Sequence, residues 1–243
     1  MYGVGNMKFE NTWTGNFEGA IRGLRNPLAS WDKSDSKWNE ENFIIGEKDI
    51  ELAQRLIKAG PEHRKFLRQI FVSVDITAPI YWWKEMSTYK ISTVVNSTST
   101  MHKLASTPIT LDCFETGTFD SSLEYYSIPT PDGKETMSNT TGMLADFFIE
   151  QLEFLRIKYN ETKDKRYWYE LIRWLPMGWL QTRSWSANYE VLYSIVRQRA
   201  NHKLEHEWGS FIHWCTTLPY AKELIFCGEE GQNIFNKYKT FEK

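Results

Sequence analysis

Residues 175–208 read LPMGWLQTRSWSANYEVLYSIVRQRANHKLEHEW and place an arginine on the apolar face of a predicted helix. Between Val191 and Val196 apolar residues recur three and four positions apart, which is a helical period. Arg199 continues this face, since it follows Ile195 by four residues and Val196 by three. A guanidinium that points inward is costly unless an anion meets it, so a carboxylate or phosphate is expected beside Arg199. The alternatives are a buried ion pair with an acidic side chain and an arginine whose charged head reaches the surface.

The composition sets modest bounds on function. The 243 residues are enough for a large hydrophobic core, and 29 basic residues nearly balance 31 acidic ones. With this balance, no broad positively charged surface that could bind a polyanion is implied, so no nucleic-acid partner is expected. The N-terminus has no signal pattern and no apolar run reaches membrane-spanning length, so the sequence predicts a cytoplasmic protein with no membrane partner.

The cysteines indicate a protein with free thiols, and the pattern along the chain indicates a single domain. Cys113, Cys215 and Cys227 are odd in number and lack C-x-x-C spacing, which fits neither a disulfide framework nor a thiolate zinc site. No repeat or linker divides the chain, so residues 1–243 are predicted to form a single domain, with 1–14 and 229–243 peripheral.

Periodicity and cap residues predict several elements. They are a helix over 16–26 that Pro27 ends, a helix over 50–59 capped by Asp49, a strand over 71–76, a helix just after Pro79, a long helix over 143–158, a helix before Pro176, and a helix that begins near Ser186 and continues beyond Trp214.

His202-Lys203-Leu204-Glu205-His206 matches the H-x-x-E-H pattern of one class of zinc metallopeptidases. Two histidines four residues apart on a helix can share a metal ion, with the glutamate as base. Chance matches to three fixed residues are common, and Arg199 and Lys203 would repel a cation. A solvated, charged helix face is the favoured interpretation, and no metal site is predicted.

Two further sets of residues suit an anionic ligand. Residues 92–100, STVVNSTST, carry six hydroxyl side chains in nine positions, and such groups can bind phosphate or simply form a polar loop. A set of basic side chains is spread along the sequence, and spacing alone does not say that its members converge: His63, Arg64, Lys84, Lys90, Arg183 and Arg199.

The segment DITAPIYWWKEMSTYKISTVVNSTSTMHKL, residues 75–104, resembles the signature region of flavin-dependent thymidylate synthases. Ala78-Pro79-Ile80-Tyr81 keeps the entry of that signature. Thr88-Tyr89-Lys90 stands where the family has R-H-R, and Thr98 stands where it has a serine. Residues 57–63, IKAGPEH, resemble the family's approach to a flavin-contacting histidine. Downstream, the family's residues are kept in register at Leu175-Pro176, Trp185, Asn188, Leu192, Arg199-Ala200 and Glu207.

This resemblance implies a fold class, a reaction and an assembly. The fold is α/β (α+β), a twisted and largely antiparallel sheet flanked by helices. The reaction is the reductive methylation of dUMP to dTMP with methylenetetrahydrofolate, FAD and NADPH, so the chain is expected to be an FAD-dependent thymidylate synthase, a methyltransferase. The partners are dUMP or another pyrimidine deoxynucleotide, and the expected assembly is a homotetramer.

The resemblance also implies which residues form the site. Arg199 takes the place of an arginine that binds and polarises dUMP, so it is the candidate catalytic residue. Further nucleotide-binding positions are Glu85, Asn96, Thr98 and Thr100. The flavin-binding positions are His63, Thr88, Tyr89, Lys90, Asn188, Glu190 and Lys203.

Several of these positions depart from the family pattern. The R-H-R motif is degenerate, and only Lys90 keeps a positive charge. The ammonium group of a lysine cannot bind a diphosphate through two parallel hydrogen bonds, as the guanidinium of an arginine does. Glu190 replaces a flavin-site arginine, Lys203 a histidine and Thr100 an arginine. Glu85 replaces a glutamine and Asn96 a glutamate, which favours as an alternative a related pyrimidine-nucleotide methylase or hydroxymethylase with an altered base or cofactor. A non-catalytic nucleotide-binding homologue is the other alternative.

Overall fold

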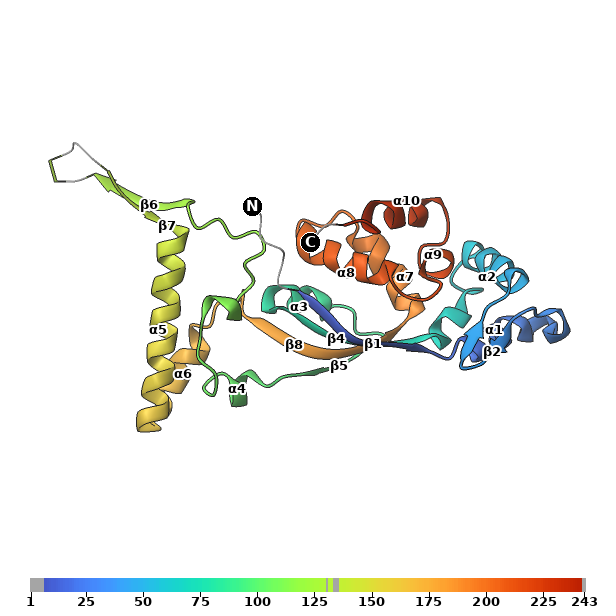
Figure 1. The fold of residues 1–243 in the computed structure, drawn as a ribbon, viewed down its shortest axis with the longest axis horizontal. Helices are drawn as coiled ribbons and strands as arrows, with labels where there is room; N and C mark the ends of the chain where they lie inside the picture. The colour runs from blue at the N-terminus through green and yellow to red at the C-terminus, as the bar shows by residue number, and fades with distance from the viewer. Residues whose placement is uncertain (1–6, 130, 133–135, 242–243) are drawn as a thin grey trace. The chain divides into compact units, whose positions relative to one another are not determined.

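The computed structural model describes residues 7–129, 131–132 and 136–241, and these residues form two compact units (Figure 1). The first unit combines Thr77–Met86 with Ser97–Thr182. The second combines Lys8–Ile76, Ser87–Asn96 and the residues from Arg183 onward. The single domain expected from the sequence stays a prediction.

The main sheet has four strands in the order β1-β4-β8-β5. The predicted strand at 71–76 is confirmed, because its apolar residues alternate with polar ones and only the apolar ones are buried. Val72, Val74 and Ile76 are buried, whereas Asp75 lies on the opposite face and accepts hydrogen bonds from Asn11 and Ser184. The strands are β1 (Lys8–Gly15), β4 (Phe71–Pro79), β5 (Val94–Ser97) and β8 (Leu180–Asn188).

The second unit packs helices on the apolar face of this sheet. Figure 1 shows α7, α8 and α10 gathered over one side of β1, β4 and β8. Phe211 of α8 is fully buried and contacts Trp185 of β8, with 6.0 Å between ring centroids. The helices of this unit are α1 (Phe17–Arg25), α2 (Glu47–Ala59), α7 (Tyr189–Arg199), α8 (Glu205–Thr216), α9 (Ala221–Leu224) and α10 (Glu229–Tyr238).

Short elements complete the second unit. The hairpin of β2 (Lys37–Asn39) and β3 (Asn42–Ile44) pairs antiparallel, and three 3-10 turns, η1 (Asn26–Leu28), η2 (Trp31–Lys33) and η3 (Lys65–Gln69), follow α1 and precede β4. The terminal segments, predicted to be peripheral, both contact α8: Phe9 of β1 stacks on Trp214 at 5.4 Å, and the backbone oxygen of Tyr238 lies 2.8 Å from His213 Nδ1.

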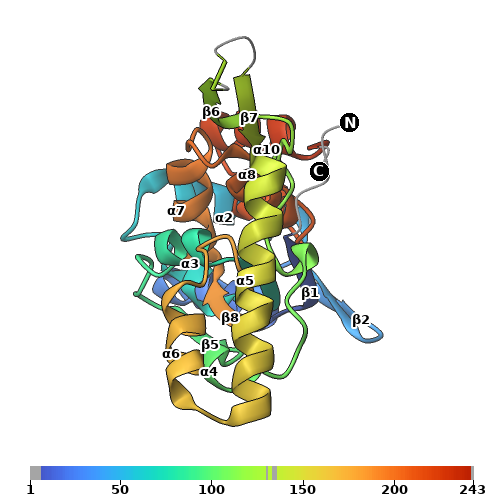
Figure 2. The same cartoon turned by 90° about the vertical axis from the view of Figure 1, so that its left-hand side faces the viewer.

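The first unit is built around two antiparallel helices. Figure 2 shows α5 (Thr141–Thr162) and α6 (Lys165–Arg173) lying side by side. The predicted helix at 143–158 is therefore confirmed and is longer at both ends. Leu152 and Leu171 anchor a buried cluster with Leu104, Ile109 and Phe114. The other elements are α3 (Ile80–Met86), α4 (Thr100–Lys103), the turn η4 (Leu111–Cys113), and the antiparallel hairpin of β6 (Glu124–Pro129) and β7 (Thr136–Thr140). In the part of the chain that the structure describes, no helix is long and apolar enough to cross a bilayer.

One helix prediction and one cap prediction are wrong. The predicted helix from Ser186 beyond Trp214 is instead the end of β8 followed by α7 and α8, because the alternating residues up to Asn188 extend the sheet and residues 200–204 form a turn. Asp49 does not cap α2, which begins two residues earlier at Glu47.

Asp49 instead lies buried at the centre of a polar cluster. Its carboxylate accepts a hydrogen bond from Arg25 Nε at 2.5 Å and from the hydroxyls of Ser34 and Ser36, each at 2.5 Å. Burial raises the pKa of Asp49, but the hydrogen bonds from Ser34, Ser36 and Arg25 outweigh it, so the pKa lies below its usual value. The cluster ties α1 and the turns after it to α2.

We expect Asp49→Ala to lower the free energy of unfolding by about 3–5 kcal/mol, because it leaves the guanidinium of Arg25 buried without its carboxylate. Urea unfolding followed by circular dichroism measures this change. Since the pKa is lowered in the folded state, the contribution of Asp49 is complete above about pH 4 and is lost as the pH falls through the folded pKa. Asp49→Asn should therefore flatten the acid limb of the stability profile; an unchanged limb would contradict this role.

Candidate functional site

The junction between β8 and α7 organises the candidate site. Asn188 is the last residue of β8, and its Oδ1 accepts a hydrogen bond from the backbone N–H of Val191 at 3.1 Å. Asparagine at this position caps a helix by satisfying one of its first free N–H groups. Tyr189 follows and is fully buried, with its hydroxyl donating to the carbonyl of Pro219 at 2.8 Å. The start of α7 is therefore fixed at both its backbone and its first side chain.

A cavity of about 330 Å³ lies at this junction, entirely within the second unit. Its volume is within the range of small-molecule sites. Three of its walls are the turn η3, the segment that links α3 to β5, and one face of α7, on which polar residues recur every four positions. We call it the α7 cavity. The lining residues are Arg68, Thr88, Tyr89, Lys90, Ile91, Ser92, Asn188, Glu190, Val191, Ser194 and Gln198.

An ion pair neutralises the one carboxylate that lines the α7 cavity. Both carboxylate oxygens of Glu190 accept from Arg64 Nε, at 2.9 and 3.0 Å. The guanidinium of Arg64 also lies 4.3 Å from the ring centroid of Tyr193, and that of Arg197 lies 3.5 Å from the same centroid. Two further cations, Arg68 and Lys90, are exposed, and neither forms an ion pair with a residue that the structure describes. The cavity therefore has a positive balance that suits an anion.

Arg199 is joined to the α7 cavity through Tyr89. Arg199 Nε donates to the Tyr89 hydroxyl at 2.8 Å, and that hydroxyl donates to Gln198 Oε1 at 3.0 Å. The guanidinium carbon lies 4.7 Å from the ring centroid of Trp208 and 5.3 Å from that of Tyr89. Arg199 is half-buried at the end of α7, as its place after the buried Ile195 predicted. Its guanidinium is held between two aromatic rings.

Five of the predicted flavin-binding residues line the α7 cavity together: Thr88, Tyr89, Lys90, Asn188 and Glu190. The other two do not line it. His63 lies exposed in the turn after α2, and Lys203 lies exposed in the turn between α7 and α8. Asn96, predicted to bind the nucleotide, is exposed on β5.

Three predicted nucleotide-binding residues belong to the first unit. Glu85 is half-buried on α3. Thr98 donates from its backbone N–H and its hydroxyl to the carbonyl of Thr182, at 3.0 and 3.1 Å, and the Thr100 hydroxyl accepts from Gln181 at 3.3 Å. The hydroxyl run is therefore tied to the start of β8, and its predicted binding of phosphate stays a prediction.

The H-x-x-E-H motif does not place two histidines on one helix. His202 lies in the turn before α8, where its Nδ1 accepts from the backbone N–H of Leu204 at 3.1 Å, and its ring packs against Trp208. His206 lies in the first turn of α8. The predicted i, i+4 geometry of the motif is therefore wrong.

The sequence interpretation missed three polar residues of the α7 cavity, Arg68, Ser194 and Gln198. Ser194 and Gln198 follow Glu190 at intervals of four residues, so a polar stripe on an otherwise apolar helix was the signal for them. Ser92 belongs to the hydroxyl run that was singled out. Arg68 comes from η3, and no local pattern distinguishes it from other surface arginines.

No protein-family model matches this sequence, and no curated protein matches it. Solved structures do match it in fold. One is thymidylate synthase X (ThyX) from Helicobacter pylori with FAD and dUMP, at 15% identity and TM-score 0.58, over 98% of this chain and 100% of that chain. Another is the UMP/dUMP methylase PolB from Streptomyces cacaoi bound with 5-Br dUMP, at 14% identity and TM-score 0.59, over 90% and 94%. The mixed fold of helices and antiparallel sheet that the sequence predicted is thereby confirmed.

We expect Tyr89→Phe to lower the free energy of unfolding by about 1–2 kcal/mol, because Arg199 Nε loses its acceptor while both rings remain. Urea unfolding measures this loss, and hydrogen exchange of the Arg199 Nε–H, followed by NMR, should accelerate. Tyr169→Phe is the matched control, since that exposed hydroxyl on α6 bonds to no residue that the structure describes. Equal effects of the two variants, or unchanged exchange at Arg199, would mean that Tyr89 does not hold the guanidinium.

Proposed function

We propose that this chain binds a pyrimidine deoxynucleotide, with dUMP as the first candidate, and methylates its ring in a flavin-dependent reaction. The observation that carries the proposal is the α7 cavity, whose walls include the two segments that bear the family resemblance, 88–92 and the start of α7. Its cationic balance and its link through Tyr89 to Arg199 support an anionic, planar ligand. The similar folds of ThyX and PolB, solved with dUMP or its 5-bromo analogue, support the same substrate class.

The residues of the α7 cavity fit a flavin nucleotide. Arg68 and Lys90 offer two positive charges to the two charges of a diphosphate, and Arg68 compensates in part for the arginine absent at Thr88. The Tyr89 ring and the Val191 side chain offer apolar contacts for a planar ring system. The bound flavin would supply the redox chemistry of the reaction.

Arg199 is the residue to which we assign the nucleotide. Tyr89 orients its guanidinium through Nε, and Trp208 supports its face. A guanidinium directed at a pyrimidine carbonyl oxygen would stabilise negative charge on that oxygen while a carbon of the ring forms its bond to the one-carbon unit. Glu85, Asn96, Thr98 and Thr100 stay predicted nucleotide contacts on the basis of the resemblance.

The finer proposal is that the chain is a thymidylate synthase. A one-carbon unit would pass from methylenetetrahydrofolate to dUMP, and two electrons from NADPH would reduce it to the methyl group of dTMP. A cytoplasmic location, expected from the sequence pattern, and a homotetramer, expected from the resemblance, accompany this proposal.

A second candidate is a pyrimidine-nucleotide methylase or hydroxymethylase that accepts a different base. Glu85 and Asn96 support it, because a carboxylate can accept from an amino group, whereas an amide both donates and accepts. Comparing dUMP with dCMP in the same assay separates the two: a tight preference for dUMP would remove the second candidate.

Arg199→Ala should weaken binding of dUMP by about 10- to 100-fold, since a charge-assisted hydrogen bond contributes about 1.5–3 kcal/mol. Isothermal titration with dUMP measures the loss, and turnover with methylenetetrahydrofolate, FAD and NADPH should disappear with it. Lys37→Ala, which removes an exposed cation from β2, is the matched control and should change neither. Wild-type protein that binds no pyrimidine nucleotide would overturn the proposal.

The double substitution Arg68→Ala with Lys90→Ala should weaken FAD binding by about tenfold or more, because both positive charges near the diphosphate are lost. Flavin absorbance retained after desalting, with and without dUMP, measures this. Glu190→Gln should have the opposite effect, since it frees the charge of Arg64. Retention of flavin in the double variant at the wild-type level would place FAD outside the α7 cavity.

A further inference from the structure

A second cavity of the second unit lies where α2, α9 and α10 meet. Its volume is about 490 Å³, which is within the range of small-molecule sites. We call it the α10 cavity. Every residue that lines it is polar, charged or a glycine, and none of them lines the α7 cavity. What the α10 cavity binds is therefore independent of the proposed function.

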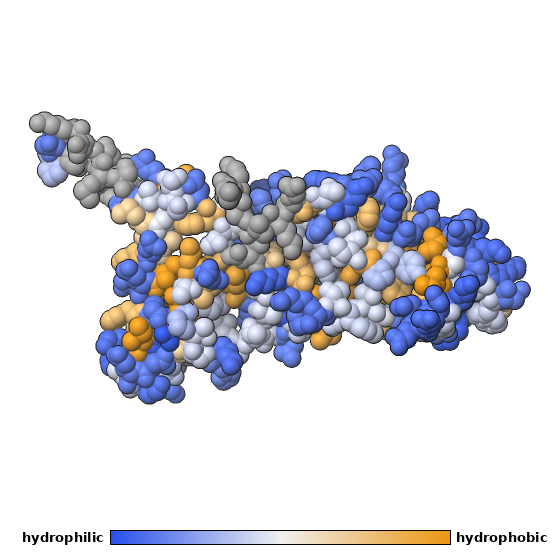
Figure 3. All heavy atoms as spheres, in the orientation of Figure 1, coloured by the Kyte–Doolittle hydropathy of each residue, from blue (hydrophilic) through white to orange (hydrophobic). Residues whose placement is uncertain are grey.

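Four charged side chains line the α10 cavity, two basic and two acidic. They are Lys58 of α2, Lys222 and Glu223 of α9, and Glu229 of α10. None of the four forms an ion pair with a residue that the structure describes. Figure 3 shows hydrophilic residues along the outer side of α10. The cavity therefore presents both signs of charge to a ligand.

This mixture of charges disfavours two simple classes of ligand. The two glutamates would repel a small anion such as phosphate, and the two lysines would repel a metal ion. Among the residues that the structure describes, no group of three or more acidic, histidine or cysteine side chains could hold a metal ion. A molecule with one positive and one negative group avoids both repulsions, because each of its groups meets an opposite charge.

Hydrogen bonds to backbone carbonyls fix the wall that α9 and α10 form. Gln232 Nε2 donates to the carbonyls of Lys222 and Phe226, at 2.8 and 2.7 Å. Arg197 donates to two further carbonyls of the same segment, at 2.9 and 2.7 Å. A Cβ at Gly231 would lie 2.4 Å from the Phe226 carbonyl oxygen, so only glycine allows this close approach. Such a preorganised wall lowers the entropy cost of binding.

Neutral polar groups complete the lining. Because Gln232 donates both of its amide protons to the backbone, its Oε1 remains as an acceptor. Gln54 Nε2 donates to the carbonyl of Glu223 at 3.5 Å, which links α2 to α9. Gly228 has a φ of 89°, and a Cβ there would meet no atom within 4 Å, so space is open in front of its backbone. An amide acceptor in the same cavity as two carboxylates favours an ammonium group.

We propose that the α10 cavity binds a free α-amino acid, a small molecule that carries an ammonium group and a carboxylate on one carbon. The carboxylate pairs with the ammonium groups of Lys58 and Lys222, and the amino group pairs with the carboxylates of Glu223 and Glu229. The remaining volume holds a polar side chain, because no apolar residue lines the cavity.

Titration calorimetry of the full chain with each standard amino acid tests the site. We expect an amino acid with a polar side chain to bind. Its N-acetyl derivative, which lacks the positive charge, and its amide derivative, which lacks the carboxylate, should each bind about tenfold more weakly or worse. Lys58→Met and Glu229→Gln, which remove one charge each, should weaken binding of the amino acid by about tenfold or more. Both variants should leave the titration with dUMP unchanged, since neither residue lines the α7 cavity.

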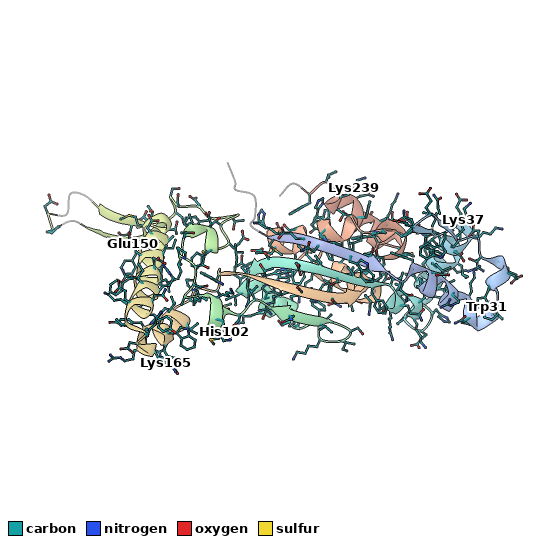
Figure 4. All side chains as sticks on the ribbon, turned by 60° about the horizontal axis from the view of Figure 1, so that its bottom comes forward. Trp31, Lys37, His102, Glu150, Lys165 and Lys239 are labelled. Atoms are coloured by element: carbon teal, nitrogen blue, oxygen red, sulfur yellow. The ribbon has the colours of Figure 1, made fainter. Side chains whose placement is uncertain are left out.

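Lys165→Met and Glu150→Gln are the matched controls. They remove the same charges from exposed positions of α6 and α5 in the first unit, labelled in Figure 4, and should not change the titration with the amino acid. Circular dichroism would show that the variants are folded. Failure of every amino acid to bind the wild type, equally tight binding of the N-acetyl derivative, or unchanged binding in both Lys58→Met and Glu229→Gln would each overturn the proposal.

Discussion

The hydrogen bond from the Val191 backbone N–H to Asn188 Oδ1 is the constraint on which the candidate site depends. It sets the residue at which β8 stops and α7 begins, and hence the rotation of every side chain along α7. With that rotation, Leu192 and Ile195 point into the core and the polar residues at intervals of four point into the α7 cavity. The same helix then ends at Arg199. A strand that ran one residue further would turn each of these groups to a different side.

The net charge of the α7 cavity depends on which of its charged side chains form ion pairs, and not only on how many acidic and basic residues line it. Glu190 would oppose an anionic ligand if its charge were free, but Arg64 engages both of its oxygens. Because the guanidinium of Arg64 also faces the ring of Tyr193, the pair is held from two sides. The cations that remain, Arg68 and Lys90, come from a turn and a loop, where side chains adjust to a ligand more readily than on a helix.

The parts of the fold that the sequence predicted well are those in which burial is periodic. The strand at 71–76 alternates strictly, and in α5 the buried Leu152 and the partly buried Ile149 and Leu155 recur at intervals of three residues, so local pattern was sufficient. The predicted helix from 186 failed because SWSAN alternates with a period of two, and the helical pattern that follows it masked the change of period. Asn188 was placed in the site by resemblance, and the structure gives its Oδ1 a capping role as well.

The sequence by itself determined that Arg199 continues an apolar helix face, because that follows from a pattern among near neighbours. That the segment around Tyr89 belongs to a ligand site stays a prediction from the family resemblance. Only the tertiary structure decided that the Tyr89 hydroxyl, 110 residues away, meets Arg199, and that Arg64 meets Glu190 across 126 residues. Periodicity records which side of an element is buried. Which polar groups face each other depends on the path of the whole chain. A hydrogen bond forms only when the fold brings a donor and an acceptor, often far apart in sequence, to the right separation within a few tenths of an ångström.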